Sequence, residues 1–253
     1  MRDLLHFRDC GGLTSRYGGH IKRDALYRSG SLTAARDEAL QRLLQLDFAL
    51  IVDLRYAGER AEEPSPWPPH YAQRVLFHDG DRAAEAPHMA PLRHGLMDEA
   101  LAERIYLEFY RELPFDPLYR PLFARALSSL PDLPGRMLVH CSAGKDRTGT
   151  LVALIQHALG VPRDEILAEY IKWRETPGLS QYVQATTHKL QERLGTRVSL
   201  ELVAKLLDVE KVYLSEFFAE IERRCGSIDA YLDTCGLNEA GRERLRTRLL
   251  TNR

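Results

Sequence analysis

The sequence predicts an α/β protein with a central, mainly parallel sheet flanked by helices. Three observations predict this class. Short apolar runs of strand length alternate with amphipathic helical patterns. The clearest of these runs is continuously apolar, as expected for a strand buried on both faces rather than on one. Beyond Thr148 the pattern is almost wholly helical, which predicts extra C-terminal helices that cover the sheet or form a lid.

Three segments have the pattern of buried strands. Phe48–Leu54 (FALIVDL) is the continuous apolar run, and Gln73–Phe77 (QRVLF) is a shorter one. Arg136–Cys141 (RMLVHC) is the third and follows the turn sequence PDLPG. A fourth segment, Ile21–Arg28 (IKRDALYR), is expected to form an edge strand.

Helical patterns separate and follow these strands. In Ala35–Leu46, three leucines fall on one face of a helix. The segment TLVALIQHALG is an apolar helix that Gly160 ends, with Pro162 just beyond. Two polar, proline-containing segments, Glu62–His70 and Asp79–His94, are expected to be loops. The remaining segments with helical periodicity are Glu99–Leu113, Pro117–Leu130, Asp164–Trp173, Leu179–Gly195, Ser199–Leu207, Val212–Gly226 and Asn238–Leu250.

The composition indicates one globular domain over residues 1–253, with 44% hydrophobic and 28% charged residues. A net charge of −1 gives no general attraction to nucleic acid or to acidic membranes. No apolar run has the length of a membrane span. The first residues contain no apolar stretch typical of a signal peptide, so we expect a cytoplasmic protein, with signal-independent export left open. Nothing in the sequence indicates an oligomeric state.

The four cysteines are Cys10, Cys141, Cys225 and Cys235. They are too few and too dispersed for a disulfide framework in a chain of this size. None forms a C-x-x-C pair, so a structural zinc site is not expected. Core packing is the expected role of Cys225 and Cys235.

One short motif carries the chemistry. Cys141 is followed by five residues, then Arg147 and Thr148, in the string HCSAGKDRTG between a predicted buried strand and a predicted apolar helix. A loop that leads into a helix N-terminus directs several backbone N–H groups at one point, and the helix dipole adds positive charge there. A tetrahedral oxyanion fits such a site. Its expected phosphate-binding residues are Ser142, Ala143, Gly144, Lys145, Asp146, Arg147 and Thr148.

The chemistry of each residue type in this motif suits phosphate binding or phosphoryl transfer. Thiols at helix N-termini near cations ionise readily, so Cys141 is expected to be a thiolate that attacks phosphorus. The planar fork of Arg147 binds two phosphate oxygens. Gly144 lets the backbone approach the anion, and the Thr148 hydroxyl can donate to the departing sulfur. His140 is expected to orient the loop through its ring nitrogens.

The motif resembles the signature of the protein tyrosine phosphatase superfamily. The full string HCSAGKDRTG is similar to that of the bacterial tyrosine and phosphoinositide phosphatases. Further blocks resemble the same family: FRDCGG, LYRSGSL, IVDLRYAGER and GSIDAYLDTCGL. The similarity spans nearly the whole chain, with Cys10 standing where the family usually has leucine. It implies a phosphatase fold and a cysteinyl-phosphate reaction on phosphorylated proteins or phosphoinositides that uses no metal and no cofactor.

Four alternatives compete with this function. A purely structural role for Cys141 is disfavoured by the arginine, the glycine and the strand-to-helix context together. A nucleotide P-loop is excluded, because Asp146 follows Lys145 where serine or threonine is needed. A phosphopeptide-binding pseudophosphatase and a rhodanese-type sulfurtransferase are the rival functions. The presence of nucleophile, arginine and acid argues against the former, and the Cys-x5-Arg-Thr spacing against the latter.

The general acid has several candidates. The resemblance implies Asp146, inside the loop. Asp53 ends a parallel strand, and since such strand ends share one rim of the sheet, it should lie near Cys141. A structural pairing of Asp53 with Arg55 is an equal possibility. The third candidate for the general acid is Asp79 or Asp81, in the predicted loop after the strand Gln73–Phe77.

Two further expectations concern Lys145 and the segment around residues 170–207. Lys145 adds a cation beside the phosphate site, which favours substrates with neighbouring phosphates such as phosphoinositides. The helices of 170–207, joined through Pro177-Gly178, are expected to form a movable lid over Cys141. Arg28 and the Phe7–Gly12 block are expected to be structural.

Overall fold

The computed structural model describes residues 4–81 and 89–251, and within these the predicted α/β class is confirmed. Five strands form one sheet in the order β1-β2-β5-β3-β4. All neighbouring pairs are parallel except β1 with β2. The strands are β1 (Arg8–Asp9), β2 (Leu26–Ser29), β3 (Phe48–Asp53), β4 (Val75–Leu76) and β5 (Arg136–His140).

The strand bounds differ from the expectation in two places. β2 begins only at Leu26 and is internal rather than an edge strand, because β1 pairs with its outer side. β4 has two residues, since Pro69–Arg74 before it forms a 3-10 helix, η1. Pro69 suits the start of such a turn, where its fixed φ fits and its missing N–H is not required.

The register of the three central strands sets the position of the site. Ser29 of β2 and Asp53 of β3 both pair with His140, the last residue of β5. The parallel strands therefore end side by side. The residues that follow β5 emerge at this rim, between the ends of its two neighbours.

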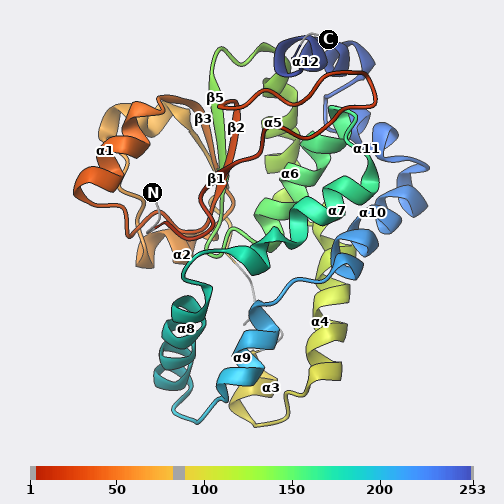
Figure 1. Cartoon of the computed structure of the whole chain (residues 1–253). Coiled ribbons are helices and arrows are strands. Elements are labelled where there is room, and N and C mark those ends of the chain that lie inside the picture. Colours follow the sequence, from red (N-terminus) through yellow and green to blue (C-terminus); the bar gives the residue numbers. More distant parts are fainter. Residues whose placement is uncertain (1–3, 82–88, 252–253) are drawn as a thin grey trace.

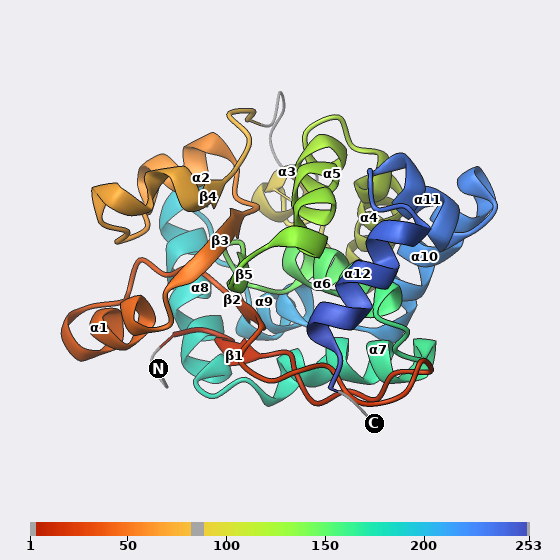
Figure 2. The same ribbon diagram turned by 90° about the horizontal axis from the view of Figure 1, so that it is seen from above.

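Helices cover both faces of the sheet (Figures 1 and 2). On one face α1 packs over Phe48, Ile51 and Leu138. On the other, a larger core joins the sheet to the C-terminal helices. The helices are α1 (Asp37–Gln45), α2 (Ala57–Glu62), α3 (Met89–Arg93), α4 (Glu99–Glu112), α5 (Tyr119–Ser129), α6 (Asp146–Ala158), α7 (Arg163–Ile171), α8 (Leu179–Leu194), α9 (Leu200–Leu207), α10 (Lys211–Cys225), α11 (Ile228–Thr234) and α12 (Glu239–Leu249). The remaining 3-10 turns are η2 (Leu113–Phe115), η3 (Leu130–Asp132) and η4 (Lys172–Glu175).

The predicted helices are found close to their expected bounds. Part of the expected loop Asp79–His94 is helical, as α3, and residues 82–88 of it lie outside the described part. α6 is buried around almost its whole circumference, as expected for an apolar helix at the centre of a layered fold. Its N-terminus therefore has a fixed position against the end of β5.

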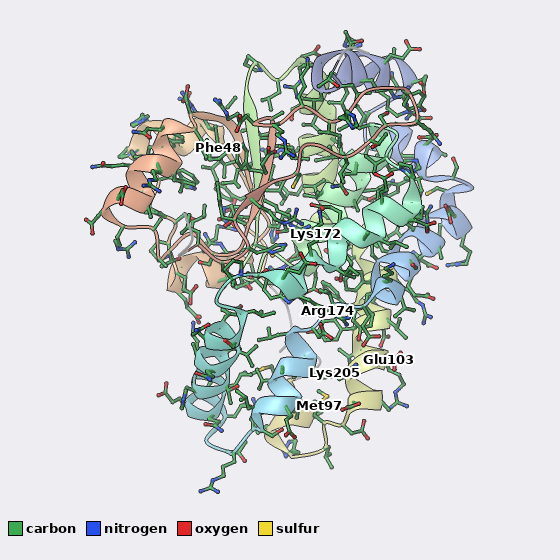
Figure 3. The ribbon with its side chains drawn as sticks, viewed as in Figure 1. Phe48, Met97, Glu103, Lys172, Arg174 and Lys205 are labelled. Carbon is green, nitrogen blue, oxygen red and sulfur yellow. The ribbon has the colours of Figure 1, made fainter. Side chains whose placement is uncertain are left out.

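α8 and α9 form a separate small layer with α3 and the start of α4. They share an apolar cluster that includes Val183, Val203 and Leu206. Met97, labelled near the lower end of the molecule in Figure 3, belongs to the same cluster. α12 lies at the other end of the molecule (Figure 1). The segment expected to form a lid thus packs mainly on its own core.

Candidate active site

The loop from Cys141 to Lys145 connects β5 to α6 at the rim where the parallel strands end. Cys141 follows the strand directly and is almost fully buried. Its Sγ accepts a hydrogen bond from the backbone N–H of Gly144 at 3.2 Å. The sulfur thus lies beside the N-terminus of the buried helix α6, with one backbone N–H directed at it.

Gly144 has a conformation and a position that no other residue fits. Its φ is +74°, in the left-handed region. A Cβ there would lie 2.5 Å from both the Gly30 nitrogen and the Ser29 carbonyl. The loop thus packs directly on the end of β2, and glycine is required for that contact.

Arg147 is held by Glu59, a residue that the sequence interpretation missed. Nη1 and Nη2 of Arg147 donate to the two carboxylate oxygens of Glu59 at 2.6 and 2.9 Å. Nη1 also donates to the Leu54 carbonyl, and the Ser142 hydroxyl donates to Glu59 at 2.6 Å. This two-point contact fixes the plane of the guanidinium. The contacts of Arg147 with the described residues involve Nη1 and Nη2 and leave out Nε.

Burial alone would raise the pKa of Glu59, but the Arg147 cation and the hydrogen bonds from Arg147 and Ser142 overcome it. The pKa of Glu59 is lowered to about 2. Glu59 is therefore charged at neutral pH and holds Arg147 rather than exchanging protons. Its only sequence signal is its place in the block IVDLRYAGER.

Asp146 is the first residue of α6 and is tied to two tyrosines. The Tyr110 hydroxyl donates to Asp146 Oδ1 at 2.6 Å, and the Tyr170 hydroxyl lies 2.5 Å from that of Tyr110. Lys145 Nζ also approaches Oδ1, at 3.5 Å. Burial, followed by the Asp146 charge, raises the pKa of Tyr110 well above its usual value, so the phenol stays neutral and donates. Neither tyrosine had been singled out in the sequence.

Lys145 lies in the loop as predicted, but its ammonium is directed towards α9. Nζ donates to the carbonyls of Leu206 and Asp208, each at 3.0 Å. It also lies 4.5 Å from the centre of the Tyr106 ring. The side chain is almost fully buried, so Lys145 connects the phosphate loop to the end of the α8–α9 layer.

Asp53 lies near the loop, as its strand end requires, but its carboxylate is occupied. Arg55 Nη2 and Nε donate to it at 2.7 and 2.9 Å, and His140 Nε2 is 3.6 Å away. Burial alone would raise the pKa of Asp53, yet the neighbouring His140 and Arg55 lower it. A carboxylate held in its charged form is a poor proton donor, so this geometry favours the structural pairing with Arg55.

The remaining acid candidates lie beside α2. Asp79 is exposed, and its Oδ1 lies 3.5 Å from Arg60. Asp81 accepts a hydrogen bond from the Gly58 amide at 3.0 Å. Neither forms a hydrogen bond with the phosphate loop among the contacts of the described residues.

Two further predicted residues are fully buried. The Thr148 hydroxyl has no hydrogen-bond partner among the described residues, which leaves it free to donate to a departing sulfur. The His140 ring nitrogens likewise form no hydrogen bond there. Cys10 packs in the main core as a small apolar side chain.

Two helices of the small layer approach the site. Burial, followed by the negative charge of a Cys141 thiolate, raises the pKa of Tyr182 on α8 to about 12. Lys189 of α8 forms an ion pair with Glu63, just after α2, at 2.6 Å. The small layer thus contacts the loop through Lys145 and pairs with the segment after α2 through Lys189 and Glu63.

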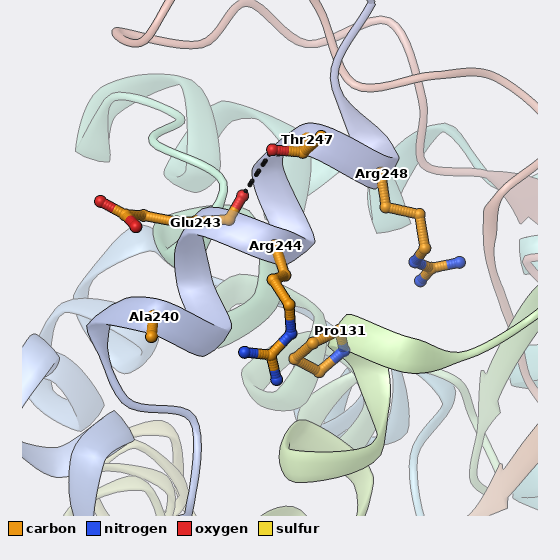
Figure 4. Close-up of a pocket in the computed structure, with 6 residues that line it drawn as sticks. All are labelled: Pro131, Ala240, Glu243, Arg244, Thr247 and Arg248. Atoms are coloured by element: carbon orange, nitrogen blue, oxygen red, sulfur yellow. Dashed lines mark hydrogen bonds between the residues drawn. The ribbon is translucent and has the colours of Figure 1, made fainter.

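A shallow pocket elsewhere has none of these features (Figure 4). It lies between α12 and η3, and Arg248 beside it donates to the carbonyls of Leu133 and Gly135, ahead of β5. It is therefore at the opposite end of β5 from Cys141. Its lining residues are Pro131, Ala240, Glu243, Arg244, Thr247 and Arg248.

Residues 4–81 and 89–251 contain no group of three or more histidine, cysteine or acidic side chains placed to hold a metal ion. In the same part of the chain, no helix combines the length and apolar character needed to cross a membrane.

The fold and the loop are those expected of a phosphatase, and comparison with known proteins agrees. A model of the tyrosine phosphatase family matches residues 1–251, and the chain belongs to this family. A protein of Cupriavidus necator named among the tyrosine-protein phosphatases is 32% identical over 235 residues, covering 90% of this chain and 80% of its own. The triple specificity protein phosphatase PtpB of Mycobacterium tuberculosis is 29% identical over 258 residues, covering 91% and 92%.

Proposed function

We propose that this phosphatase uses Cys141 as its nucleophile and forms a cysteinyl-phosphate intermediate. The observation that carries the proposal is the Gly144 N–H directed at Cys141 Sγ, beside an arginine whose fork is fixed by Glu59. A thiolate, a ring of amides and a held guanidinium together suit a phosphoryl dianion.

In the first step the Cys141 thiolate attacks phosphorus, so that an S–P bond forms and the P–O bond to the leaving group breaks. Arg147 binds two of the non-bridging oxygens. The leaving oxygen takes a proton from Asp146, through Oδ2, because Oδ1 is occupied by Tyr110. In the second step water attacks phosphorus and gives a proton to Asp146. Thr148 donates to the sulfur as it leaves.

The proposed substrates are phosphotyrosine residues, with phosphoserine, phosphothreonine and phosphoinositides as further candidates. The name of the mycobacterial relative ascribes triple specificity to that protein, which supports a site that accepts more than one class. Lys145 supports phosphoinositides, provided that its ammonium exchanges the Leu206 and Asp208 carbonyls for a second substrate phosphate.

The nucleophile is tested with Cys141→Ser, because a serine hydroxyl is far less acidic than a thiol. The variant should keep its circular dichroism spectrum and lose p-nitrophenyl phosphate hydrolysis, while chelators leave the wild type unaffected. Substantial activity in the folded variant would refute the proposal. Thiosulfate, assayed in parallel, should not be turned over.

The wider substrate range is tested with Lys145→Ala and short-chain soluble phosphoinositides. The variant should lose more activity on phosphoinositides than on p-nitrophenyl phosphate, since a nearby cation assists a second anion by about 1 kcal/mol or more. A wild type that cleaves phosphotyrosine peptides well and releases no phosphate from any phosphoinositide would exclude the lipid substrates and leave the nucleophile assignment intact.

A further inference from the structure

Arg28 is a buried cation without a carboxylate partner. Its side chain is about 1% exposed, and no acidic group of the described residues forms an ion pair with it. Its neighbour Arg8, in contrast, pairs with Glu169. Burial and the Arg8 charge lower the pKa of Arg28 to about 10, so the guanidinium is still charged at neutral pH.

Its contacts all lie on the phosphate loop. Nη2 donates to the carbonyl of Gly144 at 2.7 Å and to that of Lys145 at 3.3 Å. Nε forms no hydrogen bond with the described residues. The side chain also lies beside the start of α6: a Cβ on Gly149 would lie 3.4 Å from Nη2, and 2.9 Å from the Tyr170 ring.

These two carbonyls decide where two amides point. In a planar trans peptide the C=O and the following N–H point in opposite directions, and the described chain contains no cis peptide. Arg28 holds the Gly144 carbonyl, and it shares the Lys145 carbonyl with the Gly149 N–H, which donates to that oxygen at 2.8 Å. The N–H groups of Lys145 and Asp146 therefore point away from Arg28. As first-turn amides of α6 they have no partner within the helix.

A purely structural explanation accounts poorly for such a charge. Burying an ion costs free energy, and an opposite charge normally offsets this cost. Two carbonyl dipoles offset it only in part. A hydrophobic side chain of similar size would cost the fold less. The charge becomes favourable when a doubly negative phosphoryl group binds on the other side of the same peptide planes.

We propose that Arg28 is a positioning residue for phosphate binding, resting on the function proposed for the loop. It holds the Gly144 carbonyl and helps to hold that of Lys145, aims the Lys145 and Asp146 amides at the substrate phosphoryl group, and places behind it a positive charge that no carboxylate of the described residues pairs. The substrate itself is not touched by Arg28.

The test is calorimetric titration of inorganic phosphate into the wild type, Arg28→Met and Arg28→Lys, with thermal unfolding of each protein. Arg242→Met is the matched control. Arg242, on the distant α12, is also buried, but it pairs with Asp233 of α11 and Glu239 of α12.

Arg28→Met should weaken phosphate binding on the order of tenfold, the value of a lost charged hydrogen bond, and should melt no lower than the wild type. Arg28→Lys keeps the charge but loses the two-pronged guanidinium, so its phosphate affinity should lie between those of the wild type and Arg28→Met. Arg242→Met should show the reverse pattern, with a lower melting temperature and unchanged phosphate affinity.

The proposal would be overturned if a folded Arg28→Met protein bound phosphate as tightly as the wild type. Failure of both Arg28 variants to fold would also overturn it, because the charge is inferred to cost folding energy. A wild type that binds phosphate but hydrolyses no phosphomonoester would refute the proposed function alone, since phosphate titration needs no turnover. Absence of phosphate binding in the wild type would refute both.

Discussion

The two carboxylate oxygens of Asp146 have different surroundings. Oδ1 accepts from Tyr110 and faces Lys145, so in the proposed mechanism Oδ2 is the oxygen that exchanges the proton. Tyr110 is in turn held by Tyr170. The carboxyl group is thus oriented before substrate binds, which is what proton transfer to a leaving oxygen requires.

Asp146→Asn should slow hydrolysis of substrates with poor leaving groups much more than that of activated aryl phosphates. General acid catalysis contributes about 10²–10⁴-fold, and a good leaving group needs less of it. The measurement is kcat/KM over a series of aryl phosphates of graded acidity. Equal losses across the series would move the acid role to Asp53 or to the Asp79–Asp81 segment.

Glu59→Gln should lower kcat/KM and also change the pH dependence of stability. The folded pKa of Glu59, about 2, is below its ordinary value of 4.5. The stabilisation is therefore fully present above the ordinary value and is lost as pH falls towards the folded one. Melting temperatures of wild type and variant should differ by a constant amount near neutral pH and converge in acid. Parallel curves down to the lowest pH would contradict the role of this charge.

The loop residues were predictable from the sequence because they are adjacent, and the residues that hold them were not. Cys141, Gly144 and Arg147 fall within one motif, whose spacing and strand-to-helix context indicate the chemistry. Glu59 and Tyr110 come from other helices and reach the loop only through the fold. The direction of the Lys145 side chain likewise depends on where α9 ends.

At the level of elements, the sequence predicted strand β3 from its continuous apolar run and helices α4 to α10 from their helical periodicity. Both patterns are local properties of the sequence. The edge position of β2 was predicted wrongly, because strand order depends on Arg8–Asp9, which is too short to show a pattern. The lid expectation concerns the α8–α9 layer. Its contact with the loop, through Lys145, is polar, and Lys189 pairs with Glu63 after α2. The layer has an apolar cluster of its own, although Leu179 and Tyr182 also pack against the main core.

Val203→Asp should loosen this layer and expose Cys141 to oxidation. Val203 is fully buried in the cluster of α3, α8 and α9, and an unpaired carboxylate there disfavours packing. Inactivation by peroxide, which oxidises accessible thiolates, should be faster in the variant, with added phosphate protecting both proteins. Val212→Asp, at an exposed position, is the control. Equal inactivation rates for Val203→Asp and wild type would contradict a covering role.

At the level of the whole molecule, the two ends of the sheet carry different structural features. The rim at the carboxyl ends of the strands carries the loop, as expected for ligand sites in α/β folds. The opposite end carries α12, whose arginines are paired with neighbouring carboxylates or carbonyls. The pocket beside α12 (Figure 4) should therefore have no part in catalysis.

Arg244→Ala should leave kcat/KM for p-nitrophenyl phosphate unchanged. Arg244 is exposed and forms an ion pair with Asp132 at 3.3 Å, and surface pairs of this kind contribute about 0–1 kcal/mol to stability. Steady-state kinetics and a melting curve suffice as measurements. A large loss of activity with an unchanged melting temperature would show that this pocket takes part in the reaction.

The most direct test of the mechanism is to trap the intermediate on Cys141. Wild-type protein mixed with radiolabelled substrate and quenched during turnover should carry label on the peptide that contains Cys141, bound through sulfur. Asp146→Asn should retain that label longer, because water loses its general base in the second step. Rapid turnover with no label on Cys141, or label on another residue, would contradict the account.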